Sequence, residues 1–169
     1  MPQTWLTRGG LRGIGGWSLV SNLPRRIAER SRSAILEALN HNNLTAAIEC
    51  VELSAPGPGT CAVLVAEFES TRAGFSALGE KNKPAEQVGQ EAAQSLLAFV
   101  QTEAAIEEHL ADQMVVFLAL ASGRCQFTTS KVTRHLLTNL WTVQQCLPVR
   151  TRVEGHEGEP GLVTIEPTP

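Results

Sequence analysis

The feature that most constrains the fold is an alternation of strand-like and helix-like stretches along nearly the whole chain. In the first part, strands are expected at about residues 11–20, 45–55, 60–70 and 73–80, and helices at about 24–40 and 84–101. The Pro/Gly cluster SAPGPG favours a turn, so the strands on either side of it are expected to form a hairpin or to be neighbours. Such alternation predicts an α/β (α+β) fold.

The alternation restarts near Ala105. The second part predicts helix, strand, helix, strand, strand at Ala105–Ala121, Arg124–Thr129, Arg134–Leu147, Val149–Val153 and Leu162–Ile165. Leu11 to about Thr102 therefore forms one α/β unit, and a second unit begins after it.

Charge is unevenly distributed along the 169 residues, although the net charge is only −3. Residues 1–32 and 124–152 are basic, whereas residues 49–108 are acidic. Two basic blocks that fold together would form a phosphate-facing surface, and the alternative is a scatter of solvated charges.

Cysteine spacing and hydropathy indicate which classes of protein to exclude. The four cysteines lack CxxC or Cys/His spacing, so a structural zinc site is not expected, and no residue is assigned as a metal ligand. Neither a signal peptide nor an apolar run long enough to span a bilayer is apparent. A reducing cytosol, and hence a cytoplasmic location without a membrane partner, is the expectation.

The helix expected at Ala105–Ala121 carries polar side chains on one face. His109, Asp112 and Gln113 share that face with Val116, because they lie at helical spacing. The apolar stripe is predicted to be Ile106, Leu110, Met114 and Phe117. Since Met114–Ala121 is uncharged, the helix is expected to be largely buried and its polar face to need partners. The alternative is an ordinary capping and surface pattern.

The second helix of this part begins with His135. The positive end of the helix dipole favours neutral imidazole, which can act as a nucleophile or base. Backbone N–H groups there suit a phosphate, and Lys131 and Arg134 add donors. This pattern is what phosphoryl or nucleotidyl transfer to histidine needs, while the alternative is a surface histidine at a helix end. No GxSxG elbow is present, and one aspartate, Asp112, is too few for paired-carboxylate hydrolysis.

Several segments resemble the RNA 3'-terminal phosphate cyclase family. EEHLADQMVVFLALASG, HLLTN and LPVR resemble the C-terminal part of that family. GGLRGIGGWSLVSNLPRRIAER and GEK–PAEQVG resemble its inserted domain, so the resemblance runs from about Arg8 to Arg150. The combination of E-[HY]-LADQ with HLLTN is more specific than either motif alone.

The resemblance implies an enzyme that uses ATP and a divalent metal, expected to be Mg²⁺, to convert an RNA 3'-phosphate into a 2',3'-cyclic phosphate. The family's nucleophilic histidine, which becomes covalently attached to AMP, corresponds to His135. Asp112 and Gln113 correspond to the adenylate site, and His109 to a residue beside the adenine. Phe75 is a weaker candidate for an adenine contact.

The resemblance also implies a domain organisation. Residues 1–104 correspond to the inserted α/β domain with its leading strand, and residues 105–169 to the C-terminal repeat of the catalytic core. Earlier core repeats have no counterpart here, so the chain is expected to be a truncated piece that is weakly active or inactive alone. Self-association or pairing with the missing N-terminal half is then expected. The alternatives are a non-catalytic, cyclase-like ribosome-assembly protein, against which His135 argues, and a remnant RNA-binding module.

Overall fold

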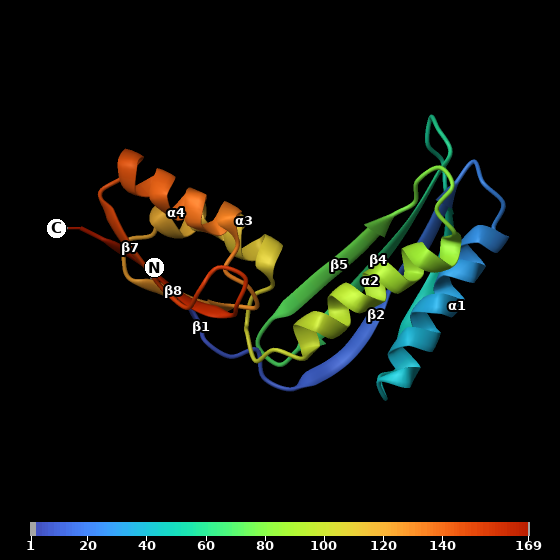
Figure 1. The fold of residues 1–169 in the computed structure, drawn as a ribbon, viewed down its shortest axis with the longest axis horizontal. Coiled ribbons are helices and arrows are strands. Elements are labelled where there is room, and N and C mark those ends of the chain that lie inside the picture. Colours follow the sequence, from blue (N-terminus) through green and yellow to red (C-terminus); the bar gives the residue numbers. More distant parts are fainter. Residues whose placement is uncertain (1–2, 169) are drawn as a thin grey trace. The chain divides into compact units, whose positions relative to one another are not determined.

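A computed structural model describes residues 3–168 and divides the chain into two compact units (Figure 1). Unit 1 contains the described residues up to Gly9 and those from Thr102 onwards, and unit 2 is Gly10–Gln101. Each unit has its own four-stranded sheet. The mixed α/β class predicted from the sequence is therefore confirmed.

Unit 2 is built on a sheet with strand order β3-β2-β4-β5. Its elements are β2 (Leu11–Ser21), α1 (Arg26–His41), β3 (Ala47–Leu53), β4 (Gly59–Phe68), β5 (Arg72–Leu78) and α2 (Ala85–Val100). β3 runs parallel to β2, because α1 returns the chain before the next strand begins. β4 and β5 are antiparallel to their neighbours.

The predicted hairpin around SAPGPG is wrong, because β2 lies between β3 and β4. The α1 crossover places β3 on one side of β2, and the chain then crosses the end of β2 to reach its other side. The Asn22 Nδ2 atom donates to the carbonyl oxygens of Ala55 and Gly57 at 2.8 and 3.3 Å, which fixes the loop in that path. The turn signal was correct, but it joins two strands that are not neighbours.

α1 and α2 cover one face of this sheet (Figure 1). On the inward side of α2, Val88, Ala92 and Leu96 are fully covered and Phe99 is 3% exposed. The two helices approach so closely at Gly89 that an added Cβ would lie 2.3 Å from the carbonyl oxygen of Ser31. The Arg30 guanidinium also donates to both carboxylate oxygens of Glu86, at 2.6 and 2.7 Å.

Unit 1 has strand order β1-β6-β8-β7. Its elements are β1 (Thr4–Trp5), α3 (Glu108–Ala119), β6 (Cys125–Thr129), α4 (Arg134–Cys146), β7 (Val149–Glu154) and β8 (Gly161–Pro167). β8 is antiparallel to both of its neighbours, and β1 adds to β6 in parallel. β1 was not predicted, because two residues are too short to show a pattern.

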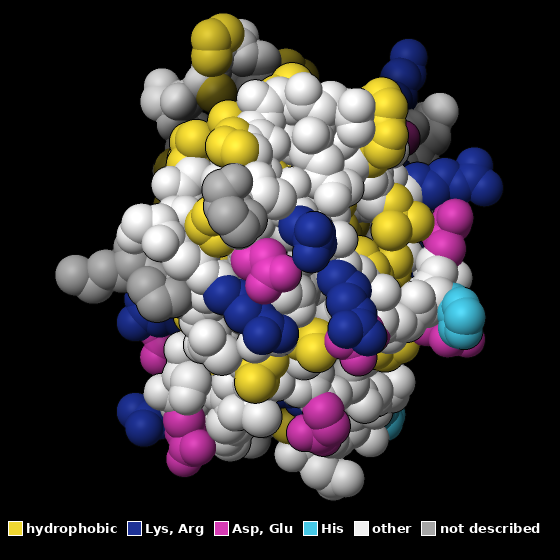
Figure 2. Space-filling model, turned by 90° about the vertical axis from the view of Figure 1, so that its left-hand side faces the viewer, with side chains coloured by type: hydrophobic (Ala, Val, Ile, Leu, Met, Phe, Trp, Pro, Cys, Tyr) yellow, Lys and Arg dark blue, Asp and Glu magenta, His cyan; other side chains and the backbone are white. Residues whose placement is uncertain are grey.

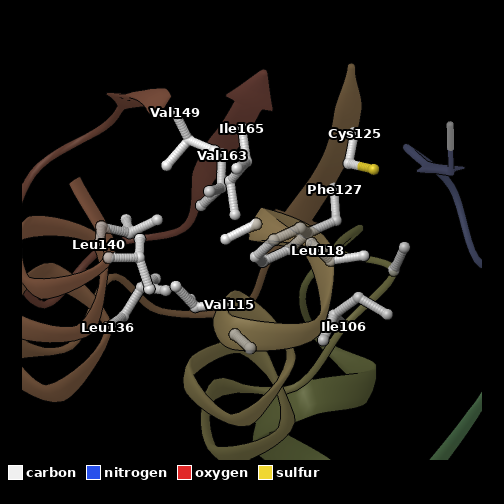
Figure 3. Close-up of a cluster of buried hydrophobic side chains, with 14 residues drawn as sticks. Ile106, Val115, Leu118, Cys125, Phe127, Leu136, Leu140, Val149, Val163 and Ile165 are labelled. Carbon is white, nitrogen blue, oxygen red and sulfur yellow. The ribbon is translucent and has the colours of Figure 1, made fainter. Parts of the chain in front are cut away.

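A single apolar core joins α3 and α4 to this sheet (Figure 3). Leu136 and Leu140 from α4 and Val115 and Leu118 from α3 pack toward the sheet residues around Phe127. No helix within residues 3–168 combines the length and apolarity that crossing a bilayer would require.

The apolar stripe predicted for the Ala105–Ala121 helix is correct at Ile106, which is buried, and at Met114, which packs against the core, but it is wrong at Leu110 and Phe117. Leu110 is 37% exposed and Phe117 is 77% exposed, whereas Ala111, Val115 and Leu118 are buried. This helix has apolar side chains on most sides, so the spacing of its large apolar residues did not identify which face is buried. Ala111 and Ala119 allow close packing beside Val115 and Leu118, whereas Phe117 and Leu120 are left outside.

Candidate functional site

α3 begins at a buried acidic cap. The carboxylate of Glu107, which is 8% exposed, accepts hydrogen bonds from the backbone N–H groups of His109, at 2.9 Å, and of Leu110. A carboxylate at this position satisfies backbone donors that have no intrahelical partner and interacts favourably with the helix dipole. The cap fixes the first turn, which carries His109.

The polar face predicted on α3 is largely open to solvent. Its exposed side mixes polar and apolar groups: His109, Gln113, Val116, Phe117 and Leu120. Asp112 is half-buried and lies at the side of the helix. The expectation that this helix is largely buried, with polar groups that need internal partners, is therefore wrong, and His109 and Gln113 are accessible to a ligand.

α4 begins at Thr133, whose Oγ1 atom accepts from the N–H of Leu136 at 3.1 Å. The β7–β8 turn fixes the segment before this cap. The N–H of Val132 donates to the Glu159 carbonyl at 2.7 Å, and the N–H of Gly158 donates to the Val132 carbonyl at 2.9 Å. His135 follows the cap in the first turn of the helix and is exposed.

Asn139 connects the two predicted parts of the site. Its Nδ2 atom donates to the main-chain carbonyl of Asp112 at 3.1 Å, which ties α4 to α3. His135 lies one helical turn before Asn139 and therefore on the same side of α4. Helical spacing therefore puts His135 on the same side of α4 as the side chain that contacts α3. This link between Asn139 and α3 had no signal in the sequence.

Carboxylates accompany the cations near His135. Lys131 Nζ lies 3.3 Å from Glu108 Oε2, and Arg134 Nε donates to Glu157 Oε1 at 2.7 Å. Figure 2 shows the same mixture on the face it displays, where blue Lys and Arg side chains lie beside magenta carboxylates. Exposed ion pairs of this kind contribute little stability and exchange readily, so both cations remain available to an incoming phosphate.

The described residues do not form a protein cage for a metal ion. Within residues 3–168, no cluster of three or more His, Cys, Asp or Glu side chains has metal-binding geometry. All four cysteines are free thiols. Phe75 is not suited to adenine contact, because its side chain is buried in the core of unit 2, with its ring centroid 5.7 Å from that of Phe99.

Asn139→Asp is expected to loosen the site. The substitution replaces the amide donor with a carboxylate that repels the Asp112 carbonyl, so the free energy of unfolding of unit 1 should fall by about 1 kcal/mol or more. Urea denaturation followed by circular dichroism measures the change, with Asn82→Asp in the exposed loop before α2 as the matched control. Equal midpoints for the two variants would show that the Asn139 contact does not hold the helices together.

Known proteins match this chain in two ways: a family profile matches residues 6–101, and longer proteins match most of the chain. Residues 6–101 match a family profile described as "RNA 3'-terminal phosphate cyclase (RTC), insert domain". A Pyrococcus furiosus protein named RNA 3'-terminal phosphate cyclase is 40% identical over 152 residues, covering 90% of this chain and 44% of that protein. Proteins of the same name from Methanopyrus kandleri and Methylococcus capsulatus are 40% and 38% identical over 94% and 96% of this chain. The chain spans 47% and 45% of their lengths, respectively.

Proposed function

This chain belongs to the RNA 3'-terminal phosphate cyclase family, and we propose that it carries the nucleotide-accepting part of such an enzyme. In the proposed reaction, an imidazole nitrogen of His135 attacks the α-phosphate of ATP. A P–N bond forms, the bond to the β-phosphate breaks and pyrophosphate leaves. The AMP then passes to an RNA 3'-phosphate. Attack by the vicinal 2'-OH closes the 2',3'-cyclic phosphate and expels AMP.

The observation that carries this proposal is the position of His135. It is exposed in the first turn of α4, where helix N–H groups and the dipole favour an anion. The exchangeable cations Lys131 and Arg134 precede it in the sequence and add positive charge for a triphosphate. Nucleophile and phosphate-binding groups thus come from one short segment.

Asp112, Gln113 and His109 are proposed to bind the nucleotide beside the nucleophile. The exposed Gln113 amide offers both donors and acceptors to a base or ribose, and His109 offers a ring that can stack on the adenine. Asp112 is held by the contact of its main chain with Asn139. This arrangement supports one surface that presents ATP to His135 in a fixed orientation.

A divalent ion, proposed to be Mg²⁺, would accompany ATP and neutralise charge on its phosphates. Mg²⁺ usually relies on substrate phosphates and a few carboxylates rather than an all-protein cage. The described residues offer Asp112 near the site but no cluster of ligands. No step is therefore assigned to metal ligands of this chain. A cytoplasmic location is proposed because free cysteines suit a reducing compartment.

The exposed apolar side of α3 supports association with further cyclase polypeptide. Val116, Phe117 and Leu120 are 50%, 77% and 67% exposed beside Gln113. Apolar side chains clustered on one surface mark contact sites more often than free surface. Since the matched relatives are more than twice as long, we propose that cyclase polypeptide beyond this chain covers that side and completes the site.

Labelling with ATP tests the proposal. The chain is incubated with ATP labelled at the α-phosphate and Mg²⁺, alone and with the part of the Pyrococcus furiosus relative outside the matched region. We expect covalent label that is acid-labile and alkali-stable, that increases in the mixture and that is discharged by RNA ending in a 3'-phosphate. No label in either sample, under conditions that label the whole relative, would instead support a non-catalytic RNA-binding protein.

A further inference from the structure

We propose that the open face of the unit 2 sheet binds one nucleotide of single-stranded RNA, with its base stacked on Trp17. This inference rests on the proposed function for the identity of the ligand, because it assumes an RNA substrate. The site is a trough of about 510 Å³, and its lining includes Gly13, Gly15, Trp17 and Glu49. That volume lies within the usual range for small-molecule sites.

Strand register determines what surrounds Trp17. On β2 the buried positions face α1 and α2, and the alternate positions, including Trp17, face away from them. Glu49 of β3 and Val63 of β4 lie directly beside Trp17. Within unit 2, no described helix packs on this side of the sheet. Trp17 is 43% exposed as a result, although tryptophan is usually well buried.

Glycines make the floor of the trough beside the indole ring. A Cβ added at Gly13 would have no neighbour within 4 Å, and one added at Gly15 would meet only the Ala47 carbonyl, at 3.7 Å. The trough therefore combines a projecting aromatic ring with bare backbone, which lets a planar group approach the sheet closely. Base–aromatic stacking is a common source of affinity for single-stranded nucleic acids.

Glu49 supplies a polar contact for the edge of the base. It forms no ion pair among the described residues, so its carboxylate is available beside Trp17. A carboxylate accepts two hydrogen bonds, and guanine presents two adjacent donors, its N1–H and N2–H groups, on its Watson–Crick edge. Uracil presents a single N–H there between two carbonyl acceptors, which a carboxylate repels. The trough is therefore expected to prefer guanine.

Charge disfavours a second copy of the chain on this face. Glu49 and Glu67 lie along the trough, and in a symmetric sheet-to-sheet dimer such carboxylates would be brought against their copies. Arg72 lies 3.2 Å from Glu67 in a pair whose side chains are 76% and 52% exposed. That guanidinium can turn to an RNA phosphate at little cost. With one cation and two carboxylates present, stacking rather than phosphate attraction should dominate, so binding should depend only weakly on salt.

Fluorescence anisotropy tests the inference with the full chain and two labelled RNA hexamers. One contains guanosine and adenosine, the other contains only uridine, and both end in a 3'-phosphate. Trp17→Ala is expected to weaken binding to the guanosine-containing RNA about tenfold, whereas Trp17→Phe retains part of the stacking. Gly13→Leu fills the trough and should weaken binding similarly, and its circular dichroism and urea midpoint check that it folds. Glu49→Gln should remove the preference for guanosine.

Trp141→Ala is the matched control, because it removes an exposed tryptophan from α4 in unit 1, and its binding should match that of the unchanged chain. Binding that is insensitive to both Trp17→Ala and Gly13→Leu would overturn the inference. Strong salt dependence without base preference would also overturn it, as would a change in sedimentation for Trp17→Ala that reveals a dimer contact. ATP labelling of the chain needs no RNA. Absence of covalent label would therefore contradict the proposed function, whereas RNA binding at Trp17 is tested separately by anisotropy.

Discussion

His135→Ala is expected to abolish covalent AMP attachment in the completed enzyme. Alanine leaves no nucleophilic atom at the start of α4, so no P–N bond can form, and labelling should fall at least about a thousandfold. His109→Ala should behave differently, because His109 is proposed to stack on the adenine rather than to react. Label should still form in that variant but at higher ATP concentrations.

Radiolabel from the α-phosphate of ATP measures both effects in the chain combined with the remainder of the relative. His156→Ala is the matched control, since His156 is an exposed histidine in the β7–β8 turn and should label as the unchanged chain does. Undiminished label on His135→Ala would show that the nucleophile lies elsewhere. Loss of label in all three variants would point to a general loss of folding, which circular dichroism detects.

Gly89→Ala is expected to destabilise unit 2, even though alanine is the better helix former by about 1 kcal/mol. The new Cβ would lie 2.3 Å from the Ser31 carbonyl oxygen and 3.0 Å from its carbonyl carbon. These are backbone atoms, so α1 and α2 must separate and lose packing along their contact. Overpacking of this kind costs about 1–3 kcal/mol, so the free energy of unfolding should fall.

Gly74→Ala provides the matched control in the same unit, because a Cβ there meets nothing within 4 Å. Its stability should be unchanged or slightly higher, since alanine loses less backbone entropy on folding than glycine. Urea denaturation compares the two variants. If Gly89→Ala proved as stable as Gly74→Ala, the close helix contact would not constrain the fold.

Element types in this chain are predictable from sequence, whereas the pairing of strands is only partly so. Each long strand and helix expected from residue 11 onwards is present, because local periodicity and turn residues determine them. The β3–β4 hairpin was wrong because a turn signal such as SAPGPG is local, while strand order depends on where α1 returns the chain.

The candidate site was predictable to a similar degree. The motifs singled out His109, Asp112 and His135, but part of the inward face of α3 was misassigned because Leu110 and Phe117 resemble core residues. Only the packed structure shows that Ala111 faces inward. The contact between Asn139 and Asp112 is also tertiary, so spacing along one helix could not reveal it.

The pairing of β1 with β6 has a consequence for the order of folding. Trp5 is aligned with Phe127 across the sheet, although all of unit 2 lies between them in the chain. During synthesis the first strand therefore leaves the ribosome long before its partner exists. Unit 2 contains all of its own strands and is expected to fold first. Its folding links the segments before and after it, so that the loop to be closed when β1 pairs with β6 becomes effectively shorter. Refolding kinetics should accordingly show a faster phase for unit 2 and a slower one for unit 1.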